Sequence, residues 1–142
     1  MKNNIVNYFI VFLVFLFLFE NKVNSQEIQF NASEIQSLDD GNKIIAYNGV
    51  EIIDPKGIVI QANDSEYDKL KSILKVKNNV SINDTINNNT LFTNEAIYFI
   101  NENKIISKDK TVIKIEENYT IDTSNVTYDR NLKEIFSTEK TL

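Results

Sequence analysis

Apolar and polar residues alternate with a period of two along most of the chain after Gln26. In residues 44–52 and 74–82, apolar side chains return at every second position over most of each run. This spacing is typical of β-strands with one buried face. β-branched residues fill these runs, whereas Asn, Asp, Gly and Pro gather between them, as in turns. We therefore expect an all-β domain over residues 26–142, with helix only in the segment that precedes it.

The alternating runs recur as a repeat unit. The unit that starts at Ile60 has Ala62 two positions later, Tyr67 seven later, and apolar residues fourteen, twenty and twenty-two later. Similar units start at Phe30, Phe92 and Ile121, and a period of about 30 residues is typical of stacked or rolled repeats. The repeated apolar positions are our candidates for the inner face of the fold: Phe30, Ile44, Val50, Ile60, Tyr67, Leu74, Val80, Ile82, Phe92, Ile97, Phe99, Ile106, Ile121, Val126 and Tyr128.

Each unit changes the parity of its apolar positions near its start. Ile60 and Tyr67 are separated by an odd number of positions, so a regular strand would place them on opposite faces. Both can be buried on one face only if an extra residue lies between them. The pattern therefore predicts a β-bulge or a corner after the position two residues beyond the start of each unit, which is Ala62 in the unit from Ile60.

The N-terminus has the pattern of a secretory signal peptide. Lys2 precedes twelve consecutive apolar residues, 8–19, and small or modest side chains follow. Twelve helical residues are shorter than the ~20 needed to cross a bilayer, although an uncleaved anchor stays open if the count starts at Ile5. We expect a signal peptide over residues 1–25, cleavage between Ser25 and Gln26, and an exported domain over residues 26–142.

Composition excludes several kinds of chemistry. The chain has no Cys and no His, so disulfides, Cys/His or Ser/His nucleophile systems and His-bound zinc are impossible. The net charge is −5 and the Lys residues are scattered, so a nucleic-acid partner is not expected. Asp64, Glu66 and Asp68 alternate on one strand face and could gather Ca²⁺, but a solvated polar face is the favoured interpretation. We expect no enzyme, no cofactor and no metal site.

Two stretches resemble a known family. Residues 60–82, IQANDSEYDKLKSILKVKNNVSI, and residues 91–115, LFTNEAIYFINENKIISKDKTVIKI, resemble the OstA-like lipopolysaccharide-transport proteins, with the best matches at Ala62, Tyr67-Asp68 and Asn79-Val80. The likeness extends over about residues 28–142. It is most similar to the N-terminal periplasmic domain of the outer-membrane lipopolysaccharide-assembly protein, because the fourth unit stops at Leu142, but a periplasmic bridging protein stays open.

The resemblance implies a fold, a ligand and partners. The implied fold is a folded-over antiparallel β-jellyroll. Its apolar inside, formed by the candidate residues above, would hold the acyl chains of lipopolysaccharide. Its edge strands would pair with other OstA-like transport modules, in the periplasm and in association with the outer membrane, where a barrel would follow the domain.

The alternating strands also fit a protein of another class. A β-sandwich whose two faces pack together shows the same period-two pattern. The alternative is a secreted or surface-bound structural or adhesive β-repeat protein with a closed core. The two hypotheses differ in whether the inner face lines a slot for lipid or fills itself.

Overall fold

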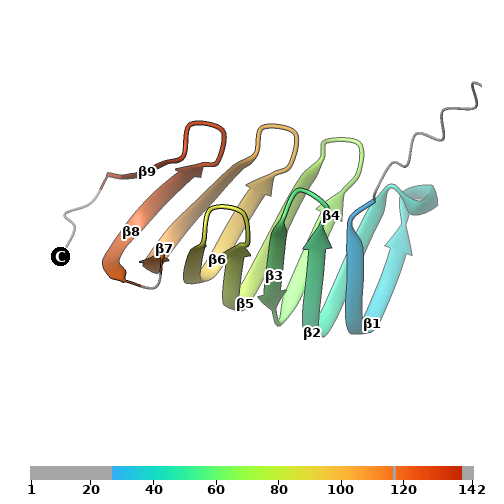
Figure 1. Ribbon diagram of the computed structural model, residues 1–142. Helices are drawn as coiled ribbons and strands as arrows, with labels where there is room; N and C mark the ends of the chain where they lie inside the picture. The colour runs from blue at the N-terminus through green and yellow to red at the C-terminus, as the bar shows by residue number, and fades with distance from the viewer. Residues whose placement is uncertain (1–26, 117, 139–142) are drawn as a thin grey trace, which may run out of the picture.

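The computed structural model describes residues 27–116 and 118–138, and in this part of the chain nine strands form one antiparallel sheet (Figure 1). The expected signal peptide and its cleavage site lie outside the described residues. Within them, no helix is long and apolar enough to cross a membrane. The elements are β1 (Gln29–Leu38), the 3₁₀ turn η1 (Asp39–Gly41), β2 (Lys43–Asp54), β3 (Ile58–Ala62), β4 (Asp64–Asp68), β5 (Ile73–Asp84), β6 (Asn89–Phe99), β7 (Lys104–Ile115), β8 (Tyr119–Asp129) and β9 (Glu134–Ser137).

The sheet folds over on itself because its long strands bend near their middles. The pairing register shifts within β1, β5, β6 and β7, and Asn63 separates β3 from β4 in the same zone. Asn48, Asn79 and Asn125 have positive φ there, a conformation that Asn adopts more readily than other non-glycine residues. The predicted bulges and corners are therefore confirmed. We call the two parts of the folded sheet the β3 half and the β4 half, after the short strand that each contains.

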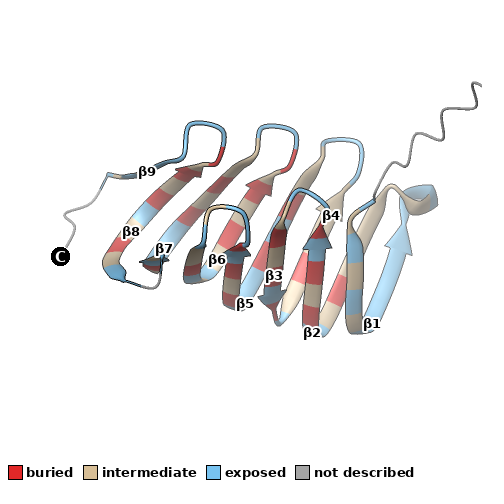
Figure 2. Ribbon diagram, in the orientation of Figure 1, coloured by how far each residue is buried: buried red, intermediate tan, exposed pale blue. Residues whose placement is uncertain are grey.

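Each half presents one row of large inward side chains. Residues directly opposite one another in an antiparallel sheet lie on the same face, so the pairing register defines the rows. The row of the β4 half is Ile44, Tyr67, Leu74, Tyr98, Ile105, Tyr128 and Ile135. The row of the β3 half is Phe30, Ile52, Ile60, Ile82, Leu91, Ile113 and Ile121. The two rows form one core between the halves, and the buried bands in Figure 2 follow them.

The third repeat unit starts one residue earlier than predicted. Leu91 is 1% exposed and faces the core, whereas Phe92 is 39% exposed and lies on the outer face. The same correction applies to the other predicted inner residues of this unit, Ile97, Phe99 and Ile106, whose buried neighbours occupy the inner face instead. A start at Leu91 also makes the spacing of the units more even. The prediction was wrong here because apolar residues occupy both parities.

The ends of the sheet are β1 and β9. β1 pairs only with β2, and β9 pairs only with β8, within the described residues. Each edge strand thus has one side whose backbone groups face no neighbouring strand of this chain. The observed fold is the expected folded-over antiparallel β-jellyroll.

Candidate functional site

The space between the two halves is the candidate site, because most of the predicted inner residues meet there. The inner face holds Phe30, Ile44, Val50, Ile60, Tyr67, Leu74, Val80, Ile82, Ile121, Val126 and Tyr128. Some contacts cross from one half to the other: the rings of Phe30 and Tyr67 stack with centroids 5.7 Å apart. The corrected residues Phe92, Ile97, Phe99 and Ile106 are on the opposite, outer face.

The centre of this space is filled by the protein itself. Leu74, Val76, Ile82 and Ile105 are each no more than 1% exposed, so the two halves pack directly against each other. Close-packed interiors of this kind have no room for an additional chain without movement of the halves. The described structure is therefore a closed form of the folded sheet.

One long side of the folded sheet is its mouth, opposite the bends. The turns 69–72, 100–103 and 130–133 form the rim of the β4 half and lie in a row along the top of Figure 1. The turns 55–57 and 85–88 belong to the rim of the β3 half. Any ligand that enters the space from the side has to pass between these two rims.

Two hydrogen-bonded ties cross the mouth. The Tyr98 hydroxyl donates to Asp54 Oδ2 at 2.6 Å, and the Tyr128 hydroxyl donates to Asp84 Oδ2 at 2.7 Å. In each tie the tyrosine comes from the β4 half and the aspartate from the end of a β3-half strand. The second tie repeats the first one unit further along the chain, so both are features of the repeat.

The tie at Asp84 is a buried network. Arg130 donates to Asp84 through Nε at 2.8 Å and Nη2 at 3.2 Å, and Asn87 donates through its backbone and its side chain. Burial raises the pKa of Asp84, but the hydrogen bonds from Arg130, Asn87 and Tyr128 outweigh it and hold that pKa well below its usual range. Burial followed by the hydrogen bond to Asp84 raises the pKa of Tyr128 to about 12.

The tie at Asp54 has fewer partners. Besides the Tyr98 hydroxyl, the Asp54 carboxylate accepts a hydrogen bond only from the backbone N–H of Lys56 among the described residues, at 3.0 Å. The Lys56 ammonium crosses the mouth as well, donating to the carbonyl of Ile100 at 2.9 Å. Burial, and then the hydrogen bond with Asp54, raises the pKa of Tyr98, so its hydroxyl stays a donor at neutral pH.

The sequence pattern predicted Tyr67 and Tyr128 on the inner face, but it placed Phe99 there instead of Tyr98, and it indicated neither tie. The signal was present: Asp54 and Asp84 occupy the same position in successive units, and both have the parity of inward residues. A carboxylate at an inward position of a strand requires a partner, because burying it alone is costly. Its partner lies 44 residues away in both cases.

A cavity of about 500 Å³ opens at the mouth beside Tyr67, before the first tie. Its lining combines apolar side chains, among them Ile28 and Ile44, with the charged Lys56 and Lys69. Tyr67 is the counterpart of Tyr98 and Tyr128 in its row, but no carboxylate among the described residues accepts a hydrogen bond from its hydroxyl. Burial, followed by the charge of Asp54, raises the pKa of Tyr67.

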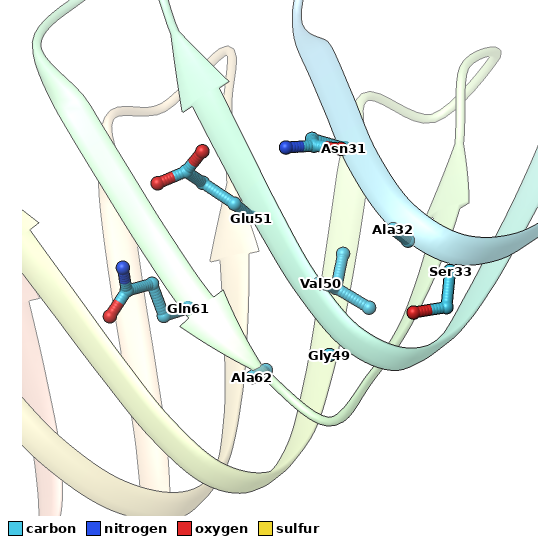
Figure 3. A pocket seen from close by; sticks show the side chains of 8 residues that line it. All are labelled: Asn31, Ala32, Ser33, Gly49, Val50, Glu51, Gln61 and Ala62. Atoms are coloured by element: carbon cyan, nitrogen blue, oxygen red, sulfur yellow. The ribbon is translucent and has the colours of Figure 1, made fainter.

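A second hollow, of about 430 Å³, lies at the bend of the sheet (Figure 3). It is lined by Asn31, Ala32, Ser33, Gly49, Val50, Glu51, Gln61 and Ala62. Its lining comes from β1, the bend of β2 and the end of β3, where the ladder is interrupted. It is a consequence of the corner and contains no group of complementary charges.

The acidic strand β4 makes local polar contacts. Glu66 forms an ion pair with Lys43 at 3.0 Å, Asp68 one with Lys71 at 2.9 Å, and Asp64 accepts a hydrogen bond from Asn78 at 2.8 Å. Each carboxylate therefore has a protein partner of its own on the polar surface, in agreement with the solvated interpretation.

Comparison with known proteins identifies the fold. No protein-family model matches the chain, and a search of curated proteins finds no matching relative. Among solved structures, the chain is similar to LptH, "the LptA homologous periplasmic component of the conserved lipopolysaccharide transport device from Pseudomonas aeruginosa", with a TM-score of 0.70 and 14% sequence identity. The match covers 79% of this chain and 82% of that one. The folded-over β-jellyroll is thus a fold that the two proteins share.

Proposed function

We propose that this chain is a periplasmic module of lipopolysaccharide transport that holds acyl chains between the two halves of its sheet. The observation that carries the proposal is the fold similarity to LptH over most of both chains, together with two continuous inward rows of apolar residues. The proposed role is binding and transfer without a chemical reaction, and it requires no cofactor.

The inward rows supply the proposed contact surface. An acyl chain between the halves would touch residues such as Ile60, Leu74 and Ile82, each of which is almost completely removed from water. Transfer of each methylene group from water to such a surface contributes ~0.8 kcal/mol. The candidate contact residues are those named above on the inner face, with Leu91, Tyr98, Ile105 and Ile113 in place of the four outward residues of the third unit.

The edge strands support the proposed assembly. β1 and β9 end the sheet on opposite sides, and unpaired strand edges can add a strand from another protein. We propose that these edges pair with other transport modules of the same fold and so continue the apolar inner face from one module to the next. Export through the signal peptide, cleavage between Ser25 and Gln26, and association with the outer membrane belong to the same proposal.

Photocrosslinking in a Gram-negative cell tests this function. Leu91 and Phe92 are adjacent residues on opposite faces, so they provide a matched pair for a photoreactive side chain. We expect lipopolysaccharide adducts from position 91 and from Tyr67, but not from position 92 or from the outward Lys75. Equal adducts from positions 91 and 92 would contradict binding between the halves.

The filled centre favours one alternative function. Because the halves pack directly and ties cross the mouth, a structural β-repeat protein with a permanently closed core also accounts for these contacts. Such a protein would give no lipopolysaccharide adducts at any inward position while folding normally. The same crosslinking series therefore separates the two functions.

A further inference from the structure

We propose that the acyl chain enters through the cavity beside Tyr67, and that the tie between Asp54 and Tyr98 is the gate that opens to admit it. The network around Asp84 then holds the two halves together while the first tie is open. This inference rests on the proposed function and adds to it the place of access and the contact that controls it.

The two ties differ in strength. Asp84 receives hydrogen bonds from Tyr128, Arg130 and Asn87 and from the backbone of Ile86. Arg130 also donates to the carbonyl of Lys56 at 2.8 Å, which adds a further link between the rims. At the first tie, by contrast, the Tyr98 hydroxyl is the one side-chain donor to Asp54 among the described residues. Across the mouth, Asp84 is held by an ion pair with Arg130 as well as by Tyr128, whereas Tyr98 is the one partner of the Asp54 carboxylate from the other rim among the described residues, so we expect the mouth to open at Asp54 first.

The cavity and the weaker tie share a wall. Asp54, Lys56 and Ile100, which make the contacts across the mouth at this tie, all line the cavity. Separation of Asp54 from Tyr98 therefore joins the cavity to the filled interior behind it. The cavity has an apolar part at Ile28, Ile44 and Tyr67 and a charged part at Lys56, Lys69 and Glu27. This division matches an amphiphile whose acyl chain enters first.

A matched pair of variants tests the gate. Tyr98→Phe and Tyr128→Phe each remove one tyrosine hydroxyl from a buried aspartate and keep the ring. The probe is fluorescently labelled lipopolysaccharide, and the measurement is its association rate with the complete mature chain by fluorescence anisotropy. We expect Tyr98→Phe to bind about tenfold faster than Tyr128→Phe, because loss of a hydrogen bond to a charged group changes an equilibrium by about that factor.

Urea unfolding of the same two variants gives the structural control. The gate proposal would be wrong if the association rates of the two variants followed their losses in free energy of unfolding and not the position of the removed hydroxyl. Equal rates for both variants would overturn it as well. If neither the variants nor the unmodified chain binds the probe, the proposed function itself fails, and the gate fails with it.

A covalent link across the gate gives an independent measurement. The native chain has no cysteine, so Lys56→Cys with Asn101→Cys creates one specific pair on exposed residues of the two rims, both lining the cavity. We expect a short bis-maleimide bridge between them to slow lipopolysaccharide association at least about tenfold, relative to the same variant carrying two separate N-ethylmaleimide groups. Equal association of the bridged and unbridged forms would place access elsewhere on the sheet.

Discussion

The buried ion pair between Asp84 and Arg130 makes a measurable prediction about stability. The Asp84 side chain is fully buried and that of Arg130 is 7% exposed, with Nε 2.8 Å from Oδ2. Asp84→Asn leaves the guanidinium buried without its counter-charge, and Arg130→Met leaves the carboxylate in the same situation. Removal of one member of a buried pair costs about 3–5 kcal/mol, so either change should lower the free energy of unfolding by roughly this amount.

The double variant isolates the interaction between the two charges from the interactions that each charge makes with its surroundings. Asp84→Asn with Arg130→Met removes both charges, so its cost should fall short of the sum of the single costs by about 1–3 kcal/mol. Urea unfolding followed by circular dichroism gives each free energy from the midpoint and the slope. Lys110→Met is the exposed control, since Lys110 pairs with Asp122 at 3.1 Å with a side chain 75% exposed, and such pairs contribute about 0–1 kcal/mol. Strictly additive costs, or a cost at Arg130 no larger than at Lys110, would refute the reasoning.

The same structure leads to three further predictions. The pKa of Asp84 is lower in the folded than in the unfolded chain, so the stability that its ionised form contributes is complete above the unfolded value of about 4 and is lost as pH falls below it. Asp84→Asn should therefore flatten the acid side of the plot of unfolding free energy against pH. Leu91→Asp should unfold the domain, whereas Phe92→Asp should cost about 1 kcal/mol or less by urea unfolding; similar costs would contradict the corrected register. Asn79→Val should cost about 1–2 kcal/mol because φ is 55° there, while Asn79→Gly, which tolerates this angle, should cost less.

Much of the fold could be predicted from the sequence because β-structure leaves a period of two that is directly visible. The odd spacing between Ile60 and Tyr67 was enough to require a bend, and the bend is present. The third unit shows where this reasoning fails. Leu91 and Phe92, like Ile105 and Ile106, are adjacent apolar residues, so hydropathy carries no information about which one faces inward. Alignment of Tyr98 with the other two tyrosines of its row would have resolved the ambiguity.

The ties could not be predicted from pattern alone, for a physical reason. A hydrogen bond between Asp54 and Tyr98 depends on the distance between the two halves of the sheet. The period-two pattern of the strands gives no information about that distance. The sequence shows that an aspartate recurs at an inward position, but not whether water, a lipid head group or a tyrosine satisfies it. Only the three-dimensional separation of the rims distinguishes these cases.

The closed interior and the proposed lipid binding are compatible once the free energies are compared. When an acyl chain replaces the contacts between the halves, the apolar surface stays buried in both states. The hydrophobic free energies of the closed and the lipid-bound states are therefore nearly equal. The uncompensated part is the tie at Asp54, whose hydrogen bond to a charged group is worth roughly 2 kcal/mol. A penalty of that size weakens the apparent affinity by about 30-fold relative to the same chain without the tie. A carrier that has to pass its ligand to the next module gains from such a penalty, because closure of the tie favours release.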